Sequence, residues 1–166
     1  MKSADKVVTN VTRMLDKSGV PFSTASYPVD ESDLSAAHAA SLLGCGPALV
    51  YKTLVCVTTH GHAVFVIPAE KDLDLKKCAA AAGEKRAELL PLKELTPLTG
   101  YLRGGCSPIG MKKRFPTFLD DSALSQERIY VSAGKRGFQV VLSPRDLLAV
   151  TDAKAAPLTR GEREDV

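Results

Sequence analysis

Residues 49–58, LVYKTLVCVT, carry the strongest strand signal in the chain. Apolar and β-branched side chains occupy both of the alternating faces of this segment. A strand that is apolar on both faces belongs in the middle of a sheet and is covered on each side. Thr59 to His62 then predict a turn, and Ala63 to Pro68 predict the antiparallel partner strand of a hairpin.

Lys52 places a charge inside this strand. By alternation it shares a face with Val50, Leu54 and Cys56, where an ammonium group loses hydration. Two interpretations stay open. The side chain could lie with its stem on apolar surface near the strand end. Alternatively it could serve a pocket, as a cation that binds phosphate or carboxylate, as a base, or as a Schiff-base nucleophile.

A second unusual segment is GGCSPIG, residues 104–110, which the cations Lys112, Lys113 and Arg114 follow closely. So much glycine and proline excludes a helix or a regular central strand. Such a loop can be an ordinary connection, or a nest of backbone N–H groups that binds an anion or a developing oxyanion. The cations are either a solvated charge run or a contact for a phosphate backbone.

The composition is that of a globular protein with one domain. The chain has 166 residues, a net charge of +3, and an aromatic content of only 5%. The low aromatic content argues against a single-strand nucleic-acid binder built on stacked rings. Four separated cysteines, no signal-peptide core and no long apolar run predict a cytoplasmic protein with free thiols. We expect one domain over residues 1–157 and a charged, frayed tail over residues 158–166.

The sequence contains no clear pattern for a catalytic nucleophile or a metal site built from side chains. Cys106 has no histidine nearby in the sequence, and Ser107 lacks the G-x-S-x-G pattern of a nucleophile elbow. His60 and His62 fit a solvated turn better than half of a metal site, and His38 fits a structural or solvated role on a helix. We therefore expect neither a metal nor a cofactor.

The remaining segments alternate between helices and strands without a strict βαβ rhythm. Helices are expected over residues 4–18 (capped by Ser3), from Asp33 or Ser35 to Leu43, from Asp74 to Ala82, for one turn from Leu92 to Leu95, and from Ser143 onward. Further strands are expected over Val20 to Tyr27, 84–90, Phe115 to Leu119 (an edge or bulge, because of Pro116), Ile129 to Ser132 and Phe138 to Leu142. These elements predict an α+β domain with a mixed, mainly antiparallel sheet, curved into a barrel-like core with surrounding helices.

Three separated blocks together resemble a known family. V-Y-K-T-L at 50–54, T-G-Y-L-x-G-G-x-S-P-x-G-x-K-K-R at 99–114 and Y-V-S-x-G-K-R-G at 130–137 are similar to the YbaK-type aminoacyl-tRNA deacylases. These are relatives of the editing domain of bacterial prolyl-tRNA synthetases. The form G-G-x-S-P-x-G resembles the free-standing Cys-tRNA(Pro) deacylase branch, and the similarity extends to about residue 153.

The resemblance implies an activity and a site. The activity would be hydrolysis of mischarged Cys-tRNA(Pro), and of Cys-tRNA(Cys) as a further substrate, with tRNA and prolyl-tRNA synthetase as partners. The thiol of the substrate would assist cleavage of the ester. Lys52 would be the essential lysine and Gly104 would orient the substrate carbonyl. The other positions expected to bind substrate are Tyr27, Leu34, Thr53, Gly105, Ser107, Gly110, Ser132 and Gln139, with Leu34 standing where the family tends to show a phenylalanine.

One position departs from the pattern of this family. A relative of this family carries an aspartate where this chain has Gln139, two residues after the K-R-G glycine, and the missing charge could shift the amino-acid preference. Two alternatives therefore stay open: a deacylase for another aminoacyl-tRNA, such as Ala or Ser, and a non-catalytic module that binds tRNA or a nucleotide. Cys106 falls at a variable position of the loop, so the resemblance gives it no catalytic role.

Overall fold

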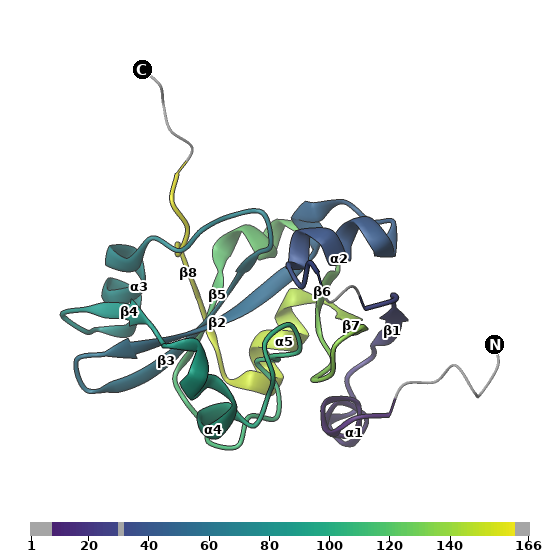
Figure 1. The fold of residues 1–166 in the computed structure, drawn as a ribbon, viewed down its shortest axis with the longest axis horizontal. Coiled ribbons are helices and arrows are strands. Elements are labelled where there is room, and N and C mark those ends of the chain that lie inside the picture. Colours follow the sequence, from purple (N-terminus) through teal and green to yellow (C-terminus); the bar gives the residue numbers. More distant parts are fainter. Residues whose placement is uncertain (1–7, 30–31, 162–166) are drawn as a thin grey trace.

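The computed structural model describes residues 8–29 and 32–161. Over these residues the chain forms a mixed α+β fold in which helices surround two adjoining sheets (Figure 1). The α-helices are α1 (Asn10–Ser18), α2 (Ala36–Leu43), α3 (Leu75–Ala82), α4 (Leu95–Thr99) and α5 (Pro144–Thr151). Short 3-10 turns, η2 (Pro47–Leu49), η3 (Leu92–Glu94) and η4 (Asp121–Ser125), connect several of them.

The larger sheet contains the predicted central strand. Its order is β4-β2-β3-β5-β8, with β2 and β3 as the antiparallel hairpin and with β5 parallel to both β3 and β8. The strands are β4 (Ala87–Leu89), β2 (Tyr51–Thr58), β3 (Gly61–Pro68), β5 (Thr117–Asp120) and β8 (Lys154–Ala156). In this order β2 has a neighbour on each side, as the sequence predicts.

The smaller sheet has the order β1-β7-β6 and is antiparallel throughout. Its strands are β1 (Ser23–Ser26), β7 (Phe138–Leu142) and β6 (Ile129–Ser132). A parallel bridge between Val50 and Tyr130 connects it to the beginning of β2. The mixed, mainly antiparallel character is confirmed, but the strand pairings of the described residues do not close into a barrel.

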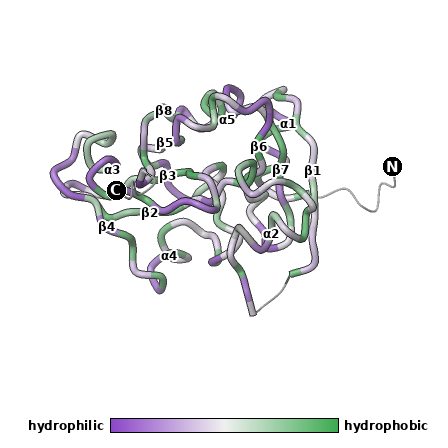
Figure 2. Tube along the Cα trace, turned by 90° about the horizontal axis from the view of Figure 1, so that it is seen from above, coloured by the Kyte–Doolittle hydropathy of each residue, from purple (hydrophilic) through white to green (hydrophobic). Residues whose placement is uncertain are grey.

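The helices lie on both sides of β2. Seen from above, α2 and α4 lie on one side of this strand and α5 lies on the other (Figure 2). One buried core of Leu15, Tyr51, Leu119 and Leu147, with further residues, joins the two sheets to α1 and α5. A second core packs Cys78 of α3 against the other end of the larger sheet, where the rings of Phe65 and Phe118 stack.

The local signals for helix ends are confirmed at several points. Ser35, Asp74 and Ser143 accept hydrogen bonds from the first turns of α2, α3 and α5, and Gly44 and Gly83 end α2 and α3. The first helix begins later than the sequence predicts, because Thr9 and Thr12 form a capping box that starts α1 at Asn10. Ser3, the predicted cap, lies outside the described residues.

Two further predictions need correction. Pro116 does not mark an edge strand: it precedes β5, which has β3 and β8 as neighbours, and its carbonyl accepts from Val64 N. The tail does not begin at 158, since Leu158 is fully buried and Arg160 N donates to Asp72 O. No helix of the described residues is long and apolar enough to cross a membrane.

Candidate active site

A cavity of about 420 Å³ lies over β2, between the α2 side and the η3–α4 side of the fold. In the view of Figure 1, α2 lies above β2 and α4 lies below it, while the view from above shows both helices on the same side of the strand (Figure 2). Seven of the residues that the sequence points to line this cavity: Tyr27, Leu34, Lys52, Thr53, Gly104, Ser132 and Gln139. Segments that are distant in the sequence, from β1 to β7, therefore meet at one hollow.

Lys52 reaches this cavity from β2. Its partner in the hairpin is Ile67, and the next pairs on the same face are Leu54 with Phe65 and Cys56 with Ala63. The predicted apolar surroundings are thus present along the strand. The lysine itself is half-buried, because the cavity opens at its end of the strand. Lys52 is therefore a half-buried cation that borders the cavity.

Two buried polar atoms of the cavity residues lack a partner. Thr53 Oγ1 and Gln139 Oε1 make no hydrogen bond within the described part of the chain. Gln139 is only 5% exposed and lies in the middle strand of the smaller sheet, opposite Ser132 of β6. A buried polar atom without a partner costs about 1–3 kcal/mol. Both residues line the cavity, so this part of the protein contains two buried polar atoms that the described chain leaves without a partner.

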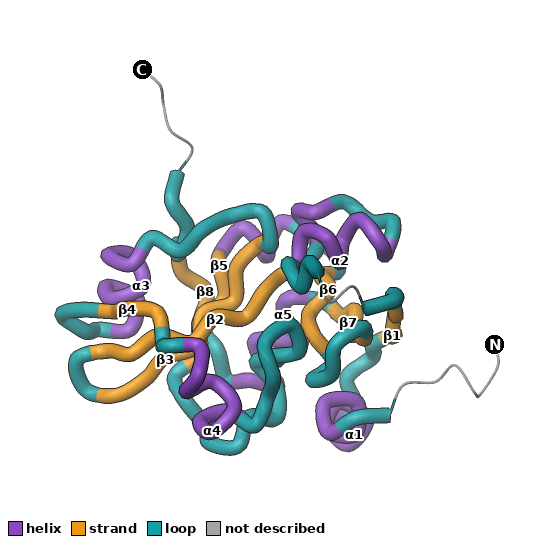
Figure 3. Tube along the Cα trace, viewed as in Figure 1, coloured by secondary structure: helices purple, strands orange, loops and turns teal. Residues whose placement is uncertain are grey.

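Gly104 brings the backbone of the glycine loop to the cavity. This loop connects α4 to β5 (Figure 3). Gly104 has a φ of +85°, which favours glycine. The preceding carbonyl, Arg103 O, accepts a 2.7 Å hydrogen bond from Arg136 Nε. The loop is therefore braced by the turn between β6 and β7.

Three other predicted residues of the loop do not line the cavity. Gly105 packs against the backbone of Lys135 and Arg136, where an added Cβ would come within 3.1 Å of Arg136 N. Its own N–H is already used, since it donates to Leu102 O. Ser107 is fully buried and its Oγ accepts from Ile109 N at 3.2 Å. Gly110 lies against Asn10 of α1. These three residues shape the loop.

Cys106 is one of the residues that line the cavity. Burial raises the pKa of its thiol to about 12, against a smaller lowering by a hydrogen bond with Thr99. The thiol is consequently protonated at neutral pH and is a poor nucleophile. Burial also raises the pKa of Cys56 to about 11 and that of Cys78 to about 12.

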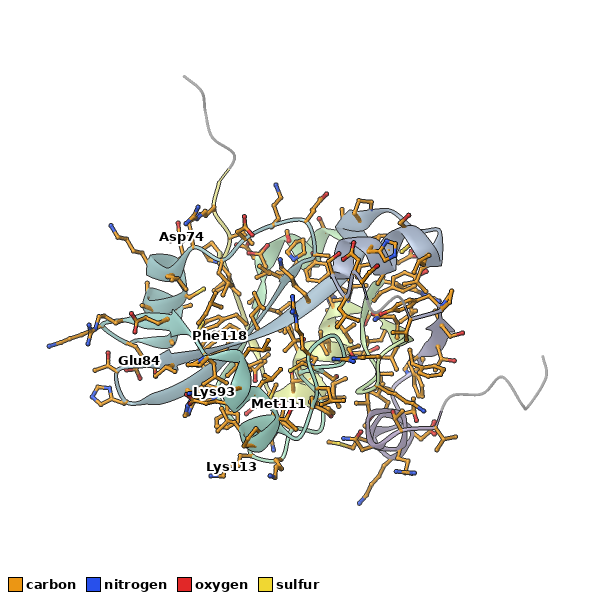
Figure 4. All side chains as sticks on the ribbon, in the orientation of Figure 1. Asp74, Glu84, Lys93, Met111, Lys113 and Phe118 are labelled. Atoms are coloured by element: carbon orange, nitrogen blue, oxygen red, sulfur yellow. The ribbon has the colours of Figure 1, made fainter. Side chains whose placement is uncertain are left out.

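The cations Lys112, Lys113 and Arg114 are exposed and do not line the cavity. Lys112 Nζ donates to Pro97 O at 3.2 Å, and Lys113 projects from the outside of the molecule near α4 (Figure 4). Among the histidines, His60 pairs with Glu84 at 2.8 Å on the surface. Within residues 8–29 and 32–161, no group of three or more His, Cys, Asp or Glu side chains could hold a metal ion.

Sequence reasoning missed one wall of the cavity. Leu89, Leu90, Leu92 and Leu95 line it from the β4–η3–α4 side, and Arg103 lies beside Gly104. The run LLPLKEL at 89–95 is rich in leucine, but leucine is the ordinary residue of a core. Only the folded chain shows that these side chains border an open hollow.

Comparison with known proteins agrees with these observations. A model of the aminoacyl-tRNA editing domain matches residues 31–150. A relative in Enterococcus faecalis, EbsC, named as a candidate Cys-tRNA(Pro)/Cys-tRNA(Cys) deacylase, is 46% identical over 93% of this chain and 94% of its own.

Solved structures are similar over the same extent. The crystal structure of a candidate trans-editing enzyme for prolyl-tRNA synthetase has a TM-score of 0.79 and 26% identity, and covers 93% of this chain and all of that one. The crystal structure of the hypothetical protein APE2540 has a TM-score of 0.83 and 26% identity, over 92% of this chain and all of that one. The resemblance found in the three sequence blocks is confirmed, and the chain belongs to the family of aminoacyl-tRNA editing domains.

Proposed function

We propose that this protein removes cysteine from mischarged Cys-tRNA(Pro), and also from Cys-tRNA(Cys), by cleaving the aminoacyl ester. The name of the Enterococcus relative, at 46% identity, supports both substrates. The structural likeness to a candidate trans-editing enzyme for prolyl-tRNA synthetase supports that synthetase as a partner. We place the whole activity in one cytoplasmic domain.

The observation that carries this proposal is the set of chemical groups on the residues that line the cavity. It presents a cation, Lys52, and two buried polar atoms without partners, while its one thiol, Cys106, stays protonated. These groups can bind and orient a substrate, but none of them is a strong nucleophile. An aminoacyl ester is already activated, so positioning of its carbonyl and stabilisation of charge on the carbonyl oxygen are what it requires.

Each lining residue then has a defined task. Lys52 binds the phosphate of the terminal nucleotide, and the Gly104 N–H orients the ester carbonyl. Thr53 and Gln139 provide the hydroxyl and the amide oxygen that lack partners within the described chain. The Ser132 hydroxyl already accepts from Gly134 N and can still donate. Tyr27 and Leu34 border the same cavity and enclose the aminoacyl group.

The thiol of the substrate supplies the nucleophile. Its sulfur attacks the ester carbonyl, a C–S bond forms, and the C–O bond to the terminal ribose breaks. The thiol proton ends on the released ribose hydroxyl, so the products are free tRNA and a cyclic cysteine thiolactone that water opens. Serine and alanine esters lack this sulfur and should react slowly.

Gln139 keeps a second candidate open, a deacylase for Ala-tRNA or Ser-tRNA. It is neutral, and it is one of the residues that line the cavity. Deacylation of Cys-, Ala- and Ser-tRNA(Pro), with and without prolyl-tRNA synthetase, separates the two candidates. Release of alanine or serine faster than cysteine would favour the second.

The Lys52→Ala variant tests the site. Loss of a charged hydrogen bond, worth about 1.5–3 kcal/mol, should lower kcat/KM on Cys-tRNA(Pro) by about 10- to 150-fold. Lys52→Arg keeps the charge and should retain part of the activity. Lys154→Ala, on the exposed end of β8, is the matched control and should not change the rate. Full activity in Lys52→Ala would overturn this assignment.

A further inference from the structure

Two chemically different groups of residues line the cavity. Lys52, Thr53, Ser132 and Gln139 are polar. A run of leucines close together in the sequence, which we call the leucine wall, consists of Leu89, Leu90, Leu92 and Leu95. A cysteinyl group is much smaller than the ligands that cavities of about 300–1,000 Å³ usually hold. The cavity, at about 420 Å³, therefore has room beyond the aminoacyl group.

The leucine wall is open to water. Leu89 and Leu92 are each 56% exposed, and Leu90 and Leu95 are half-buried. Their roles in the fold do not account for this exposure, because the inner residue of β4, Ala87, is the one that packs into the core. Apolar side chains that border a cavity and remain open to water can pack against the flat apolar surface of a ligand.

The wall is held at a fixed place relative to Lys52. Leu89 pairs with Cys56, and Leu90 N donates to Val55 O at 3.0 Å, both on the strand that carries the lysine. Three residues of strand separate Lys52 from Val55, a distance of about 10 Å. This is the scale of a nucleoside. A ligand can thus touch the lysine and the wall at the same time.

Hydrogen bonds also join the wall to the glycine loop. Thr96 Oγ1, next to Leu95, donates to Tyr101 O at 2.8 Å, and Tyr101 N donates to Thr99 Oγ1 at 3.1 Å. Tyr101 leads directly into the segment that carries Arg103 and Gly104. The wall, the loop and β2 are therefore parts of one braced frame around the cavity.

We infer that the leucine wall is the seat of the terminal adenine of the tRNA, with the 5′ phosphate of that nucleotide at Lys52. This inference rests on the proposed function. A base offers an apolar face on both sides, and apolar side chains hold such faces without hydrogen bonds. Because every tRNA ends in adenosine, the site needs no readout of base identity. The cations Lys52 and Arg103 at the same cavity complement the phosphate.

Binding of two small probes tests the wall without any hydrolysis. Adenosine 5′-monophosphate carries the base, and ribose 5-phosphate does not. In the wild type, the adenine should tighten binding by about tenfold or more, the effect of burying roughly one leucine-sized apolar surface. In the double variant Leu89→Ala/Leu92→Ala the two probes should bind almost equally. Leu92→Met, which keeps the apolar surface, should preserve the preference.

The same variants are then compared on two esters. The double variant should lose about tenfold in kcat/KM on Cys-tRNA(Pro) and nothing on cysteine methyl ester, which has no nucleotide. Leu124→Ala, an exposed leucine of η4 away from the cavity, is the matched control and should match the wild type on both.

Two outcomes would overturn the inference: equal binding of both probes to the wild type, or an unchanged preference in the double variant. Equal losses on both esters would also overturn it, because they indicate general damage. Failure of the proposed function is a separate result. A wild type that deacylates no aminoacyl-tRNA, yet binds the adenine probe through Leu89 and Leu92, supports the wall and refutes the deacylase.

Discussion

Thr53→Val should make the protein more stable and less active. The Thr53 hydroxyl is buried and has no hydrogen-bond partner within residues 8–29 and 32–161. Valine has nearly the same shape and favours a strand at least as well. The substitution removes a buried polar atom that costs about 1–3 kcal/mol in the free protein. It also removes the partner that we assign to the substrate.

The size of both effects follows from that range. For a chain of this length, each kcal/mol corresponds to about 2–4 °C in Tm, so Tm should rise by about 2–12 °C. The same hydroxyl, once bonded to substrate, is worth about 1–3 kcal/mol, so kcat/KM on Cys-tRNA(Pro) should fall by about 5- to 150-fold. Calorimetry and release of labelled cysteine measure the two quantities.

Thr117→Val is the matched control. Thr117 is also buried on a strand, but its hydroxyl donates to Phe115 O at 3.0 Å and lies outside the cavity. Its replacement should lower Tm, because the carbonyl loses its partner, and should leave the activity unchanged. If Thr53→Val is less stable than the wild type and equally active, the open hydroxyl is not a ligand group and the reasoning is refuted.

Two further predictions concern Cys106 and Asp120. The folded thiol of Cys106 titrates at about 12 and the unfolded one at its ordinary value of about 8.5, so the unfolded chain loses its proton first as the pH rises. The free energy of unfolding should therefore fall above about pH 8.5, and less steeply in Cys106→Ser, which should keep most of its deacylase activity. Equal slopes from pH 8 to 10 in thermal melts would contradict this. Asp120 is 3% exposed, and its carboxylate accepts from Leu158 N at 2.9 Å and from Ser122. Asp120→Ala should cost about 3 kcal/mol in urea denaturation, and a change below about 0.5 kcal/mol, as at an ordinary surface position, would show that these bonds do not hold the C-terminal segment.

Most of the secondary structure could be predicted because its signals are local. Ser35, Asp74 and Ser143 satisfy N–H groups of the helices that they begin, and Gly83 adopts the left-handed conformation that ends α3. The apolar stripe alone predicts too early a start for α1, because the capping box of Thr9 and Thr12 sets that start at Asn10. Strand β8, Lys154–Ala156, has no apolar alternation, and parallel pairing with β5 holds it in place.

The residues of the candidate site likewise fall into those that local sequence signals reveal and those that depend on contacts between distant segments. Lys52 stands out in the sequence because a charge in an apolar strand loses hydration. Gly104 stands out because it belongs to a segment rich in glycine and proline. Whether a loop residue faces the cavity or supports the loop depends on contacts with distant segments. Ser107 and Gly105 are inward-facing for that reason, and no spacing rule distinguishes them from Gly104. The partnerless atoms of Thr53 and Gln139 likewise arise only when β2 and β7 meet.

The most direct test of the central claim compares two substrates that differ in one atom. The wild-type protein is given Cys-tRNA(Pro) and Ser-tRNA(Pro) at equal concentration, and the initial rates of amino-acid release are measured. Our account predicts rapid release of cysteine and much slower release of serine, because only cysteine carries the sulfur that attacks its own ester. Equal rates would contradict the assisted mechanism, and no release of cysteine would contradict the deacylase function itself.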